Sequence, residues 1–358
     1  MKRSILIYYS SSQISIDLIS LILELRKKSF RVYFLSHCKK GNLQLYLEKQ
    51  GVKVESIRKI GYLKKIYHLI YYCNKNKIDV VNSHTQVNNF ILSIAQFFIN
   101  AKCIMTRHHS DYVYNGNNRM AKIFDKIINT LSKNIIAISD KVKDQMINVE
   151  GVSPNKVFRV NNGYNFDLYN NIDPNFNLNL EPSFTLINIG RFIPLKRQLL
   201  ILKAFKNIIH QGYDFKLILV GDGEQKSILN NFVIENNLQE NVIFTGHINN
   251  VLDYINISDL LVHTSESEGS STVVKEAGVF NVPSVVCENV GDFNEYLNSN
   301  NSYKISKEVK PLELTNKLIQ IYIDKMGLKE KAIRINIDIK KRFSIENTIK
   351  YYLKIINN

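Results

Sequence analysis

The chain has 358 residues, of which 45% are hydrophobic and 22% are charged, and this composition excludes disordered and collagen-like proteins. Single hydrophobic cores stop growing at roughly 250–300 residues, so the length predicts two domains. The formal net charge of +15 is uneven, because residues 1–170 hold 26 Lys and Arg against 11 Asp and Glu, whereas residues 171–358 hold 21 of each kind. The excess in the first half predicts either an anionic partner or a solvated basic face.

The amino-terminal stretch predicts a first strand and helix rather than a signal peptide. It begins with Lys2 and Arg3, but polar residues interrupt the apolar run and no cleavage site of small residues follows. No run of 18 apolar residues occurs in the sequence, so we expect no membrane span. The four cysteines are widely scattered and show neither the spacing of a disulfide framework nor that of metal ligands. They are Cys38, Cys73, Cys103 and Cys287. A cytoplasmic protein is therefore expected.

Runs rich in β-branched and aromatic residues alternate with amphipathic stretches, a pattern typical of βαβ units and parallel sheets. The strands expected in the first half are residues 4–9, 31–36, 52–57, 79–84, 101–109, 134–139 and 157–162. Those expected in the second half are residues 184–190, 216–221, 241–246, 260–265 and 283–288. Residues 169–182 are rich in Asn and lack periodicity, so we interpret them as a linker. The prediction is an α/β protein with two doubly wound domains, residues 1–168 and 183–342.

Doubly wound domains bind ligands beyond the carboxyl ends of their strands, so the residues there are candidates for a site. Gly190 ends an expected strand and is followed by Arg191 and Lys196. A guanidinium and an ammonium beside a tight turn suit a diphosphate. Gly221 and Gly223 also follow a strand, but the third glycine of a dinucleotide fingerprint is missing. We expect these two glycines to be turn residues, which disfavours a nicotinamide-dependent oxidoreductase.

Residues 265–278, SESEGSSTVVKEAG, place Glu268 and Glu276 on either side of a loop-to-helix junction. The residues at that junction are Gly269, Ser270, Ser271 and Thr272. Glycine lets a ligand approach the backbone, and free N–H groups and hydroxyls at a helix start bind anions. About one turn further, the Glu276 carboxylate is placed to accept both hydroxyls of a ribose, and Glu268 is placed to accept hydrogen bonds from a hexose. The alternative is ordinary surface charge.

In their order along the chain, these segments resemble the retaining family 4 glycosyltransferases, enzymes of GT-B architecture. Glu268 and Glu276 match the family's Glu-x7-Glu motif. The family's Gly-Arg-x4-Lys pattern is matched by Gly190, Arg191 and Lys196. Further segments that resemble the family are VGDG, IDVVNSH ending at His84, TRHHSDY with His108, and the closing KRFSIENTIKYYLKI. The similarity covers nearly the whole chain.

The resemblance implies two Rossmann-like domains that face each other across a cleft, with residues 343–358 crossing back onto the first domain. It implies that Arg191 and Lys196 neutralise the leaving diphosphate. Glu276 would bind the ribose, and Glu268 would hold the donor sugar. The base would be held largely by backbone at Gly246, His247 and Ile248.

The first domain would bind the acceptor, and His108 would lie beside both donor sugar and acceptor, with His109 as a less favoured substitute. The acceptor-binding residues would be Ser11, Ser12, His84 and His108. This chain departs from the family in three places. The loop after the first strand is Tyr9-Ser10-Ser11-Ser12 instead of Gly-rich, and Arg197 and Asp292 stand where glycine is usual.

No Asp-x-Asp pair, the usual carboxylate anchor of a metal-bound sugar nucleotide, occurs in the sequence. Cationic side chains and helix N-termini would then stabilise the departing phosphate. We therefore expect transfer from a nucleotide sugar without metal or cofactor. As the family implies, the anomeric configuration would be retained and the leaving phosphate would help to deprotonate the acceptor. The sequence specifies neither base, sugar nor acceptor.

Residues 62–77 interleave basic and aromatic side chains, namely Lys64, Lys65, Lys75 and Lys77 with Tyr62, Tyr67, Tyr71 and Tyr72. Basic residues favour anionic bilayers and tyrosines favour the bilayer interface. The stretch predicts peripheral binding at the inner face of the cytoplasmic membrane, near a lipid-linked glycan acceptor. The alternative is a solvated helix whose tyrosines pack into the core.

Two other functions compete with glycosyl transfer. A basic nucleic-acid-binding protein is disfavoured because no recognition-helix pattern, zinc spacing or aromatic-basic sheet signature appears, and we expect no nucleic-acid partner. An inactive, carbohydrate-binding GT-B-like protein is disfavoured because Glu268, Glu276, Arg191 and Lys196 are all present.

Overall fold

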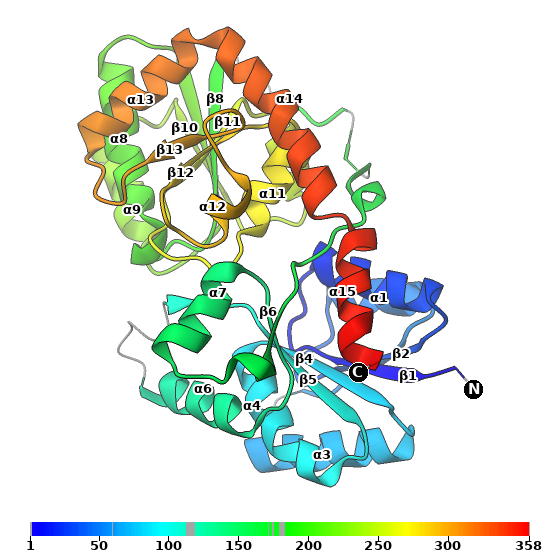
Figure 1. Cartoon of the computed structure of the whole chain (residues 1–358). Coiled ribbons are helices and arrows are strands. Elements are labelled where there is room, and N and C mark those ends of the chain that lie inside the picture. Colours follow the sequence, from blue (N-terminus) through cyan, green and yellow to red (C-terminus); the bar gives the residue numbers. More distant parts are fainter. Residues whose placement is uncertain are drawn as a thin grey trace. The chain divides into compact units, whose positions relative to one another are not determined.

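The computed structural model describes residues 2–58, 60–111, 119–170, 172–173, 175–178 and 183–357. The chain forms two compact units, one of Met1–Asn165 with Phe343–Asn358 and the other of Phe166–Arg342. Each unit has its own parallel sheet with helices (Figure 1). The expected linker, residues 169–182, lies partly outside the described residues. Its first two residues end a 3-10 helix, Phe166–Asn170, of the second unit.

The first unit contains a seven-stranded sheet in the order β3-β2-β1-β4-β5-β6-β7. Its strands are β1 Ser4–Tyr8, β2 Arg31–Ser36, β3 Lys53–Ser56, β4 Val80–His84, β5 Lys102–Arg107, β6 Ile135–Ala137 and β7 Val157–Arg159. Each run that the sequence predicted in this half forms one of these strands. All the pairings are parallel.

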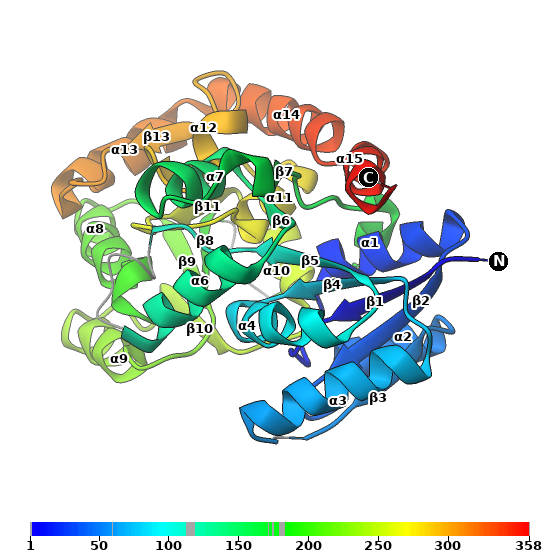
Figure 2. The same cartoon turned by 60° about the horizontal axis from the view of Figure 1, so that its bottom comes forward.

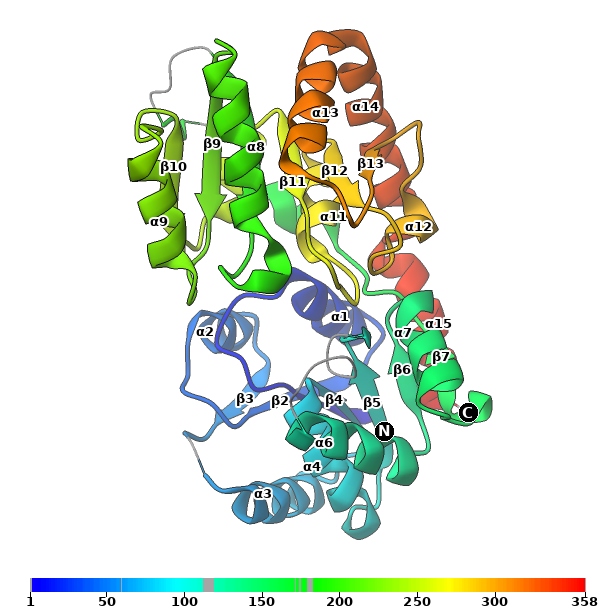
Figure 3. The ribbon, with the colours of Figure 1, turned by 90° about the vertical axis from the view of Figure 1, so that its left-hand side faces the viewer.

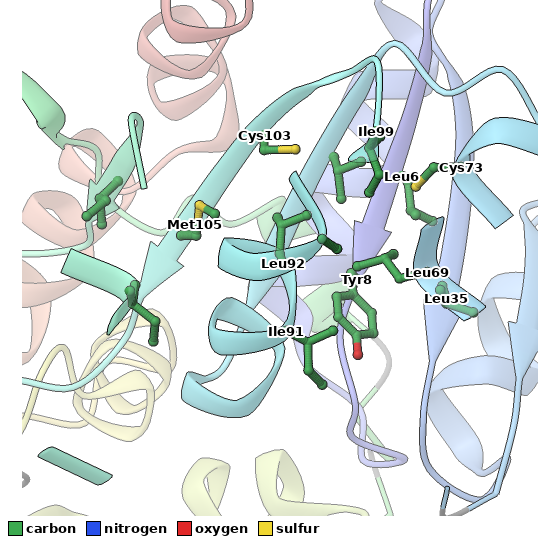
Figure 4. Close-up of a cluster of buried hydrophobic side chains, with 14 of the residues drawn as sticks. Leu6, Tyr8, Leu35, Leu69, Cys73, Ile91, Leu92, Ile99, Cys103 and Met105 are labelled. Carbon is green, nitrogen blue, oxygen red and sulfur yellow. The ribbon is translucent and has the colours of Figure 1, made fainter. Parts of the chain in front are cut away.

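The helices of the first unit are α1 Ile16–Lys27, α2 Asn42–Lys49, α3 Tyr62–Lys75, α4 Gln86–Ala95, α6 Arg119–Leu131, α7 Asp140–Asp144 and α15 Ile345–Asn357. Figure 4 shows buried side chains of β1 and β5, such as Leu6 and Met105, meeting Ile91 and Leu92 of α4 in the core. The carboxyl-terminal helix α15 belongs to this unit, although nearly two hundred residues separate it from β7. It lies beside α1 (Figures 1 and 2).

The second unit contains a six-stranded sheet in the order β10-β9-β8-β11-β12-β13. Its strands are β8 Phe184–Ile189, β9 Phe215–Val220, β10 Val242–Gly246, β11 Leu260–His263, β12 Ser284–Cys287 and β13 Tyr303–Ile305. The sequence predicted five of them and missed β13. That strand has only three residues at the sheet edge, too few for a period-two pattern.

The helices of the second unit are α8 Gln198–His210, α9 Lys226–Glu235, α10 Val251–Asn256, α11 Thr272–Val279, α12 Phe293–Tyr296, α13 Pro311–Ile323 and α14 Lys325–Arg342. The long helices α13 and α14 lie side by side (Figure 3). In the described part of the chain, no helix combines the length and the apolar character that a membrane span needs.

Strand order reverses between β1 and β4 in the first sheet and between β8 and β11 in the second. Open α/β sheets bind ligands at such switch points, beyond the carboxyl ends of the strands. Chain direction therefore brings the loops after β1 and β4, and those after β8 and β11, to the positions that form sites. Most candidate residues of the sequence lie in these loops or begin the helix after β11, whereas His108 follows β5 and Gly246, His247 and Ile248 lie at the end of β10.

The turn after β9 supports the loop after β8, and glycine is required there for close approach. Gly221 has φ +139°, and a Cβ atom on it would overlap the carbonyl oxygen of Gly190. A Cβ atom on Gly223 would lie 2.5 Å from the carbonyl oxygen of Phe192. Backbone hydrogen bonds of 3.0 Å from Gly190 to Val220 and of 2.9 Å from Phe192 to Asp222 join the two loops. Both glycines are thus turn residues.

We predict that Gly221→Ala lowers the melting temperature of the second unit, because the new methyl group must displace the Gly190 carbonyl. Overpacking of this kind costs roughly 1–3 kcal/mol. Gly61→Ala is the matched control, since Gly61 has φ −63° and open space around its Cα. Differential scanning calorimetry of both variants provides the measurement. Equal melting of the Gly221→Ala and wild-type proteins would contradict the close approach.

Candidate functional site

The loops that follow β8 and β11 are joined by hydrogen bonds. The Thr264 hydroxyl donates to the carbonyl of Lys196 at 3.2 Å, and the N–H of Glu266 donates to the carbonyl of Leu195 at 3.0 Å. Because β8 and β11 are neighbours in the sheet, these bonds hold the two loops side by side. They bring Lys196 to Glu268.

Glu268 is the centre of a compact charged cluster. Its Oε1 atom forms an ion pair with Lys196 Nζ and a 2.8 Å hydrogen bond with Nε2 of His263, a buried residue of β11. Gly291, at φ +54°, packs so closely that a Cβ atom there would lie 2.8 Å from Glu268 Cβ. The sequence predicted Lys196 and Glu268 but missed His263, five residues before Glu268.

The electrostatics of this cluster keep Glu268 ionised. Burial alone raises its pKa, but the hydrogen bond from His263 and the charges of His263 and Lys196 outweigh burial and lower the pKa to about 2. A carboxylate with such a pKa is anionic near neutral pH. It is therefore an acceptor of hydrogen bonds from hydroxyl groups.

Arg191 and Lys196 lie on either side of the turn after β8. The aliphatic part of Lys196 covers Gly190, where a Cβ atom would lie 3.7 Å from three of its carbons. Arg191 is exposed, and its carbonyl accepts a 3.1 Å hydrogen bond from the buried Gln198 amide. This bond fixes the backbone of Arg191 and leaves its guanidinium at the surface.

Arg197, which stands where the family has glycine, has a structural explanation. Its backbone is left-handed at φ +58°, a region that favours glycine. Its guanidinium donates to the carbonyl of Lys307 at 2.6 Å and lies 3.6 Å from the Glu266 carboxylate. These contacts tie the loop after β8 to the segment after β13 and offset the backbone strain.

Asp292, the other residue at a glycine position, forms a buried ion pair. Lys275 Nζ lies 2.7 Å from Asp292 Oδ2, and the two side chains are 1% and 0% exposed. The Ser270 hydroxyl donates to the same oxygen at 2.7 Å and accepts from Lys275 at 2.8 Å. Ser270, expected to offer its hydroxyl to a ligand, therefore donates it inside the domain. Sequence inspection missed Lys275, although it lies between the two motif glutamates.

The remaining second-domain candidates follow β10 or begin α11. Ser271 is the N-cap of α11 and Glu276 is the fifth residue of that helix, partly exposed. Gly246 ends β10 at φ +68° and its carbonyl accepts a 3.0 Å hydrogen bond from Gly221. Of the other four candidates, Gly269 in the loop after β11 and Thr272 at the start of α11 are partly exposed. In the loop after β10, His247 is exposed and Ile248 is partly exposed.

In the first domain, the ends of β4 and β5 bring two histidines together. His84 Nδ1 lies 3.0 Å from His108 Nε2, and His84 Nε2 lies 2.8 Å from Asn82 Oδ1. The hydroxyl of Tyr352, on α15, donates to the same Asn82 oxygen at 2.7 Å. The sequence predicted both histidines but missed Asn82 and Tyr352, because only the fold brings α15 to β4.

The Asn82 amide determines which ring nitrogens carry hydrogen. Its Nδ2 donates to the carbonyl of Ile104, so Oδ1 must face His84 and accept from Nε2–H. A neutral His84 then has a lone pair on Nδ1, and His108 must donate to it from Nε2. His108 Nδ1 is left as an acceptor.

The pKa values of both imidazoles are lowered, which favours their neutral forms. Burial lowers the pKa of His84 well below its usual value, and the charge of His108 adds to the effect. Burial also lowers the pKa of His108, where Asp17 acts in the opposite direction and His109 in the same one. A neutral His84 is compatible with this arrangement, in which Asn82 accepts from its Nε2 and His108 donates to its Nδ1.

The serine-rich loop after β1 is anchored by α2 and α4. The Ser10 hydroxyl donates to Asn88 Oδ1 at 3.0 Å, and the Gln44 amide donates to the Ser11 carbonyl at 2.8 Å. The backbone of Ser12 passes so near Gly41 that a Cβ atom there would lie 2.6 Å from Ser12 Cβ. Gly41 thus lets the segment before α2 pack closely against this loop.

His109 has a different environment from His108. Its Nε2 lies 2.9 Å from Asp125 Oδ2, next to Arg107 and Glu150, which form a bidentate pair with two distances of 2.6 Å. It thus belongs to a buried charge network. Across the described ranges, no cluster of three or more His, Cys, Asp or Glu has the arrangement of a metal site.

The halves of the chain match two protein families. The model of "Glycosyl transferases group 1" matches residues 171–341, and that of "Glycosyltransferase Family 4" matches residues 18–168. The chain is 24% identical over 347 residues to the capsular polysaccharide biosynthesis glycosyltransferase CapM of Staphylococcus aureus, covering 90% of this chain and 87% of CapM. It is also 24% identical over 240 residues to the UDP-Gal:alpha-D-GlcNAc-diphosphoundecaprenol alpha-1,3-galactosyltransferase of Escherichia coli, covering 63% and 61%.

Among solved structures, the fold matches Anabaena Alr3699/HepE, crystallised in complex with UDP and glucose. The TM-score is 0.83 at 17% sequence identity, and 99% of each chain is covered. The whole chain thus has the fold of that protein.

The hydrogen-bond directions in the first domain lead to a prediction for nuclear magnetic resonance of ¹⁵N-labelled histidine. At pH about 6.5, where a free imidazole is half protonated, His84 and His108 should both be neutral and carry hydrogen on Nε2. Asn82→Asp should raise the pKa of His84, because a carboxylate favours its charged form. The proton of His108 should then move to Nδ1.

Tyr352→Phe is the control, since it removes a donor to Asn82 but keeps the amide acceptor, and the tautomers should not change. A wild-type His108 with hydrogen on Nδ1, or a charged His84 at this pH, would refute the assignment.

Proposed function

Since the chain belongs to the group 1, family 4 glycosyltransferases, we propose that it moves a hexosyl or N-acetylhexosaminyl group from a nucleotide sugar to a glycan or lipid-linked acceptor of a cell-surface polysaccharide. The observation that carries the proposal is the Lys196–Glu268–His263 cluster beyond the carboxyl ends of β8 and β11. Lys196 and Glu268 belong to the two motifs that, by the resemblance to the family, would bind the donor.

Donor binding would use the charges of the second domain. Arg191 and Lys196 would neutralise the diphosphate, because a guanidinium fork and an ammonium both suit phosphate oxygens. Glu276 would accept both ribose hydroxyls. Glu268, anionic through its low pKa, would accept hydrogen bonds from the donor sugar. The names of the relatives support this donor class, since one contains UDP-Gal and a solved structure holds UDP and glucose.

The transfer would proceed with retention and without a metal ion. The bond between the anomeric carbon and the phosphate oxygen breaks, and a bond to the acceptor oxygen forms on the same face. The proton of the acceptor hydroxyl passes to the leaving phosphate, whose charge Arg191 and Lys196 stabilise. In the first domain, neutral His108 would offer Nδ1 as an acceptor to a sugar hydroxyl, with Asn82 and His84 as positioning residues.

Helix α3 supports a peripheral position at the inner face of the cytoplasmic membrane. Leu63 and Tyr67 are 83% and 74% exposed, and Tyr62 and Tyr71 are about half exposed. Tyr72, by contrast, is 2% exposed and packs in the core. Three of the four tyrosines thus accompany the lysines at the surface, as interfacial binding requires. A lipid-linked acceptor, like the one in the name of the E. coli relative, would be reached from there.

A thermal-shift panel of UDP-, GDP- and ADP-sugars tests the function. A ligand at 100 times its dissociation constant stabilises the native state by about 2.7 kcal/mol, so one nucleotide class should raise the melting temperature. Stabilisation by oligonucleotides, with no nucleotide sugar effective, would instead favour a nucleic-acid-binding protein.

We predict separate defects for the donor-site variants. Glu276→Ala should weaken nucleotide-sugar binding, because a ribose loses two hydrogen bonds to a charged acceptor, each worth about 1.5–3 kcal/mol. Arg191→Ala and Lys196→Ala should each slow transfer by on the order of a hundredfold. Glu268→Ala should mainly lower turnover. Calorimetry and the rate of nucleoside diphosphate release provide the two readouts.

Lys203→Ala, which removes an exposed cation of α8, is the matched control and should bind and turn over normally. The rate should also be the same in EDTA. Activity that is lost in EDTA and restored by manganese would overturn the metal-independent mechanism, and wild-type behaviour of all four site variants would overturn the site.

For the membrane proposal, we predict that Leu63→Glu/Tyr67→Glu abolishes sedimentation with anionic liposomes at low salt. The double change removes two apolar anchors and adds two negative charges. Leu312→Glu/Ile323→Glu is the control, since these α13 residues are 60% and 67% exposed in the second unit, and binding should persist. No binding of the wild type, or equal binding to neutral liposomes, would contradict the proposal.

A further inference from the structure

A basic pocket lies at the amino-terminal edge of the first sheet. Its volume is about 770 Å³, within the range of ligand sites. Cationic side chains from the end of α1 and the starts of the strands line it, namely Lys2, Arg26, Lys27, Arg31 and Lys53. The apolar lining is Leu23, Phe30, Val32 and Tyr33. We call the pocket that these cationic and apolar residues line the edge pocket.

Positive charge exceeds negative charge throughout this region. The described residues that line the edge pocket include no Asp or Glu, and an adjoining hollow adds Arg3 and Lys28. Glu24 lies 3.6 Å from both Lys27 and Lys28. Glu24, together with Asp79 near Arg3 and Arg31, does not neutralise this group of cations, so the edge pocket keeps a positive potential.

The charges of this region affect the pKa values of two neighbouring residues, Lys102 and Asp79. Burial lowers the pKa of Lys102, the first residue of β5, and the charge of Arg3 lowers it further. The hydrogen bond from the Ser4 backbone lowers the pKa of Asp79, with smaller contributions from Arg3 and Arg31. Cations are thus close enough along this edge to act on each other.

Part of the cationic lining is held in place by the fold. The Arg26 guanidinium donates to the Gln50 carbonyl. Next to it, Gly51 has φ +72°, and a Cβ atom there would lie 3.4 Å from Arg26 Nη2. Lys53 lies 5.3 Å from the ring centroid of Tyr33. Preorganised cations lose less entropy when they bind an anion.

Other cations of the edge pocket are available to a ligand. Within the described chain, the side chains of Lys2 and Arg31 take part in no hydrogen bond or ion pair. Both are exposed. Arginine forks match phosphate oxygens in pairs, and lysine adds a mobile charge.

The edge pocket is separate from the candidate acceptor residues. Lys2 precedes β1 and Arg31 begins β2, whereas Ser11 and Ser12 follow the other end of β1. Five strand residues span roughly 17 Å. Segments near the two ends of the chain meet at this edge, where Arg3 donates to Asn357 Oδ1 at 3.0 Å (Figures 1 and 2).

We propose that the edge pocket binds a phosphate group carried on a partly apolar molecule, at a site distinct from sugar transfer. The cations would surround the phosphate oxygens, and the apolar residues beneath would contact the rest of the ligand. The concave shape and limited volume fit one phosphorylated group better than an extended strand of nucleic acid. The same chemistry is offered by the headgroup of an acidic lipid and by a soluble phosphate ester.

Amide resonances of the whole chain, titrated with inorganic pyrophosphate at low salt, test the site. Gly51 and Val32 should shift, and Lys2→Gln/Arg31→Gln should raise the dissociation constant read from them by on the order of tenfold or more. Lys133→Gln/Lys350→Gln, which removes two exposed lysines elsewhere in the same unit, should leave it within about twofold of wild type. Gly190 reports the second domain separately and should respond equally in all three proteins.

Sedimentation with vesicles of phosphatidic acid, against phosphatidylcholine, distinguishes the two phosphate sources. Vesicle binding that only Lys2→Gln/Arg31→Gln weakens assigns the edge pocket to a lipid headgroup. Pyrophosphate binding at Gly51 and Val32, with vesicle binding absent or equal in the wild type and both double variants, assigns it to a soluble phosphate. The proposal fails if Gly51 and Val32 do not respond to pyrophosphate and both double variants bind vesicles like the wild type. It also fails if both double variants lose affinity equally.

Discussion

The site of the second domain depends on one ionised carboxylate, that of Glu268. Lys196 and His263 converge on the same oxygen, and their contacts lower a pKa that burial alone would raise. Removing Lys196 takes one of two charged or hydrogen-bonding partners from the partly buried Glu268 carboxylate, which destabilises the domain. The surrounding residues hold this cluster in place. Hydrogen bonds join the loops after β8 and β11, and Gly291, which has no side chain, allows Glu268 to pack closely against it. The same contacts that position the two charges thus stabilise the domain.

The histidine pair of the first domain shows the opposite case, because burial lowers the pKa of His84 and of His108. The Asn82 side-chain oxygen accepts hydrogen bonds from Tyr352 and from Nε2 of His84. Nδ1 of a neutral His84 is then an acceptor, so His108 carries its hydrogen on Nε2. A carboxylate in place of this amide would favour the charged form of His84. In the proposed reaction, charge is needed where the diphosphate leaves, and a neutral acceptor suits a sugar hydroxyl. The contrast between the two domains follows from a carboxylate at the centre of one site and an amide at the centre of the other.

The order of elements and the residues after each strand could be predicted from the sequence, because periodicity and strand ends are local properties. The motif residues Lys196 and Glu268 were found in the same way. Other features depend on contacts between distant segments. Ser270 turns inward because Lys275 and Asp292 meet beneath it, and Arg197 braces a loop more than a hundred residues away. The short edge strand β13 and the pairing of Tyr352 with Asn82 likewise have no local signature.

The coupling between Lys196 and Glu268 offers the most direct measurement. Wild type, Lys196→Met, Glu268→Gln and the double variant are titrated calorimetrically with UDP, GDP and ADP. We predict that one diphosphate binds the wild type and that Lys196→Met weakens it strongly, because the Glu268 carboxylate, no longer neutralised by Lys196, then repels the phosphates. Adding Glu268→Gln to Lys196→Met should restore part of the affinity, although the same change in the wild-type background should not improve it. No binding of any diphosphate, or an equal effect of Glu268→Gln in both backgrounds, would contradict the account.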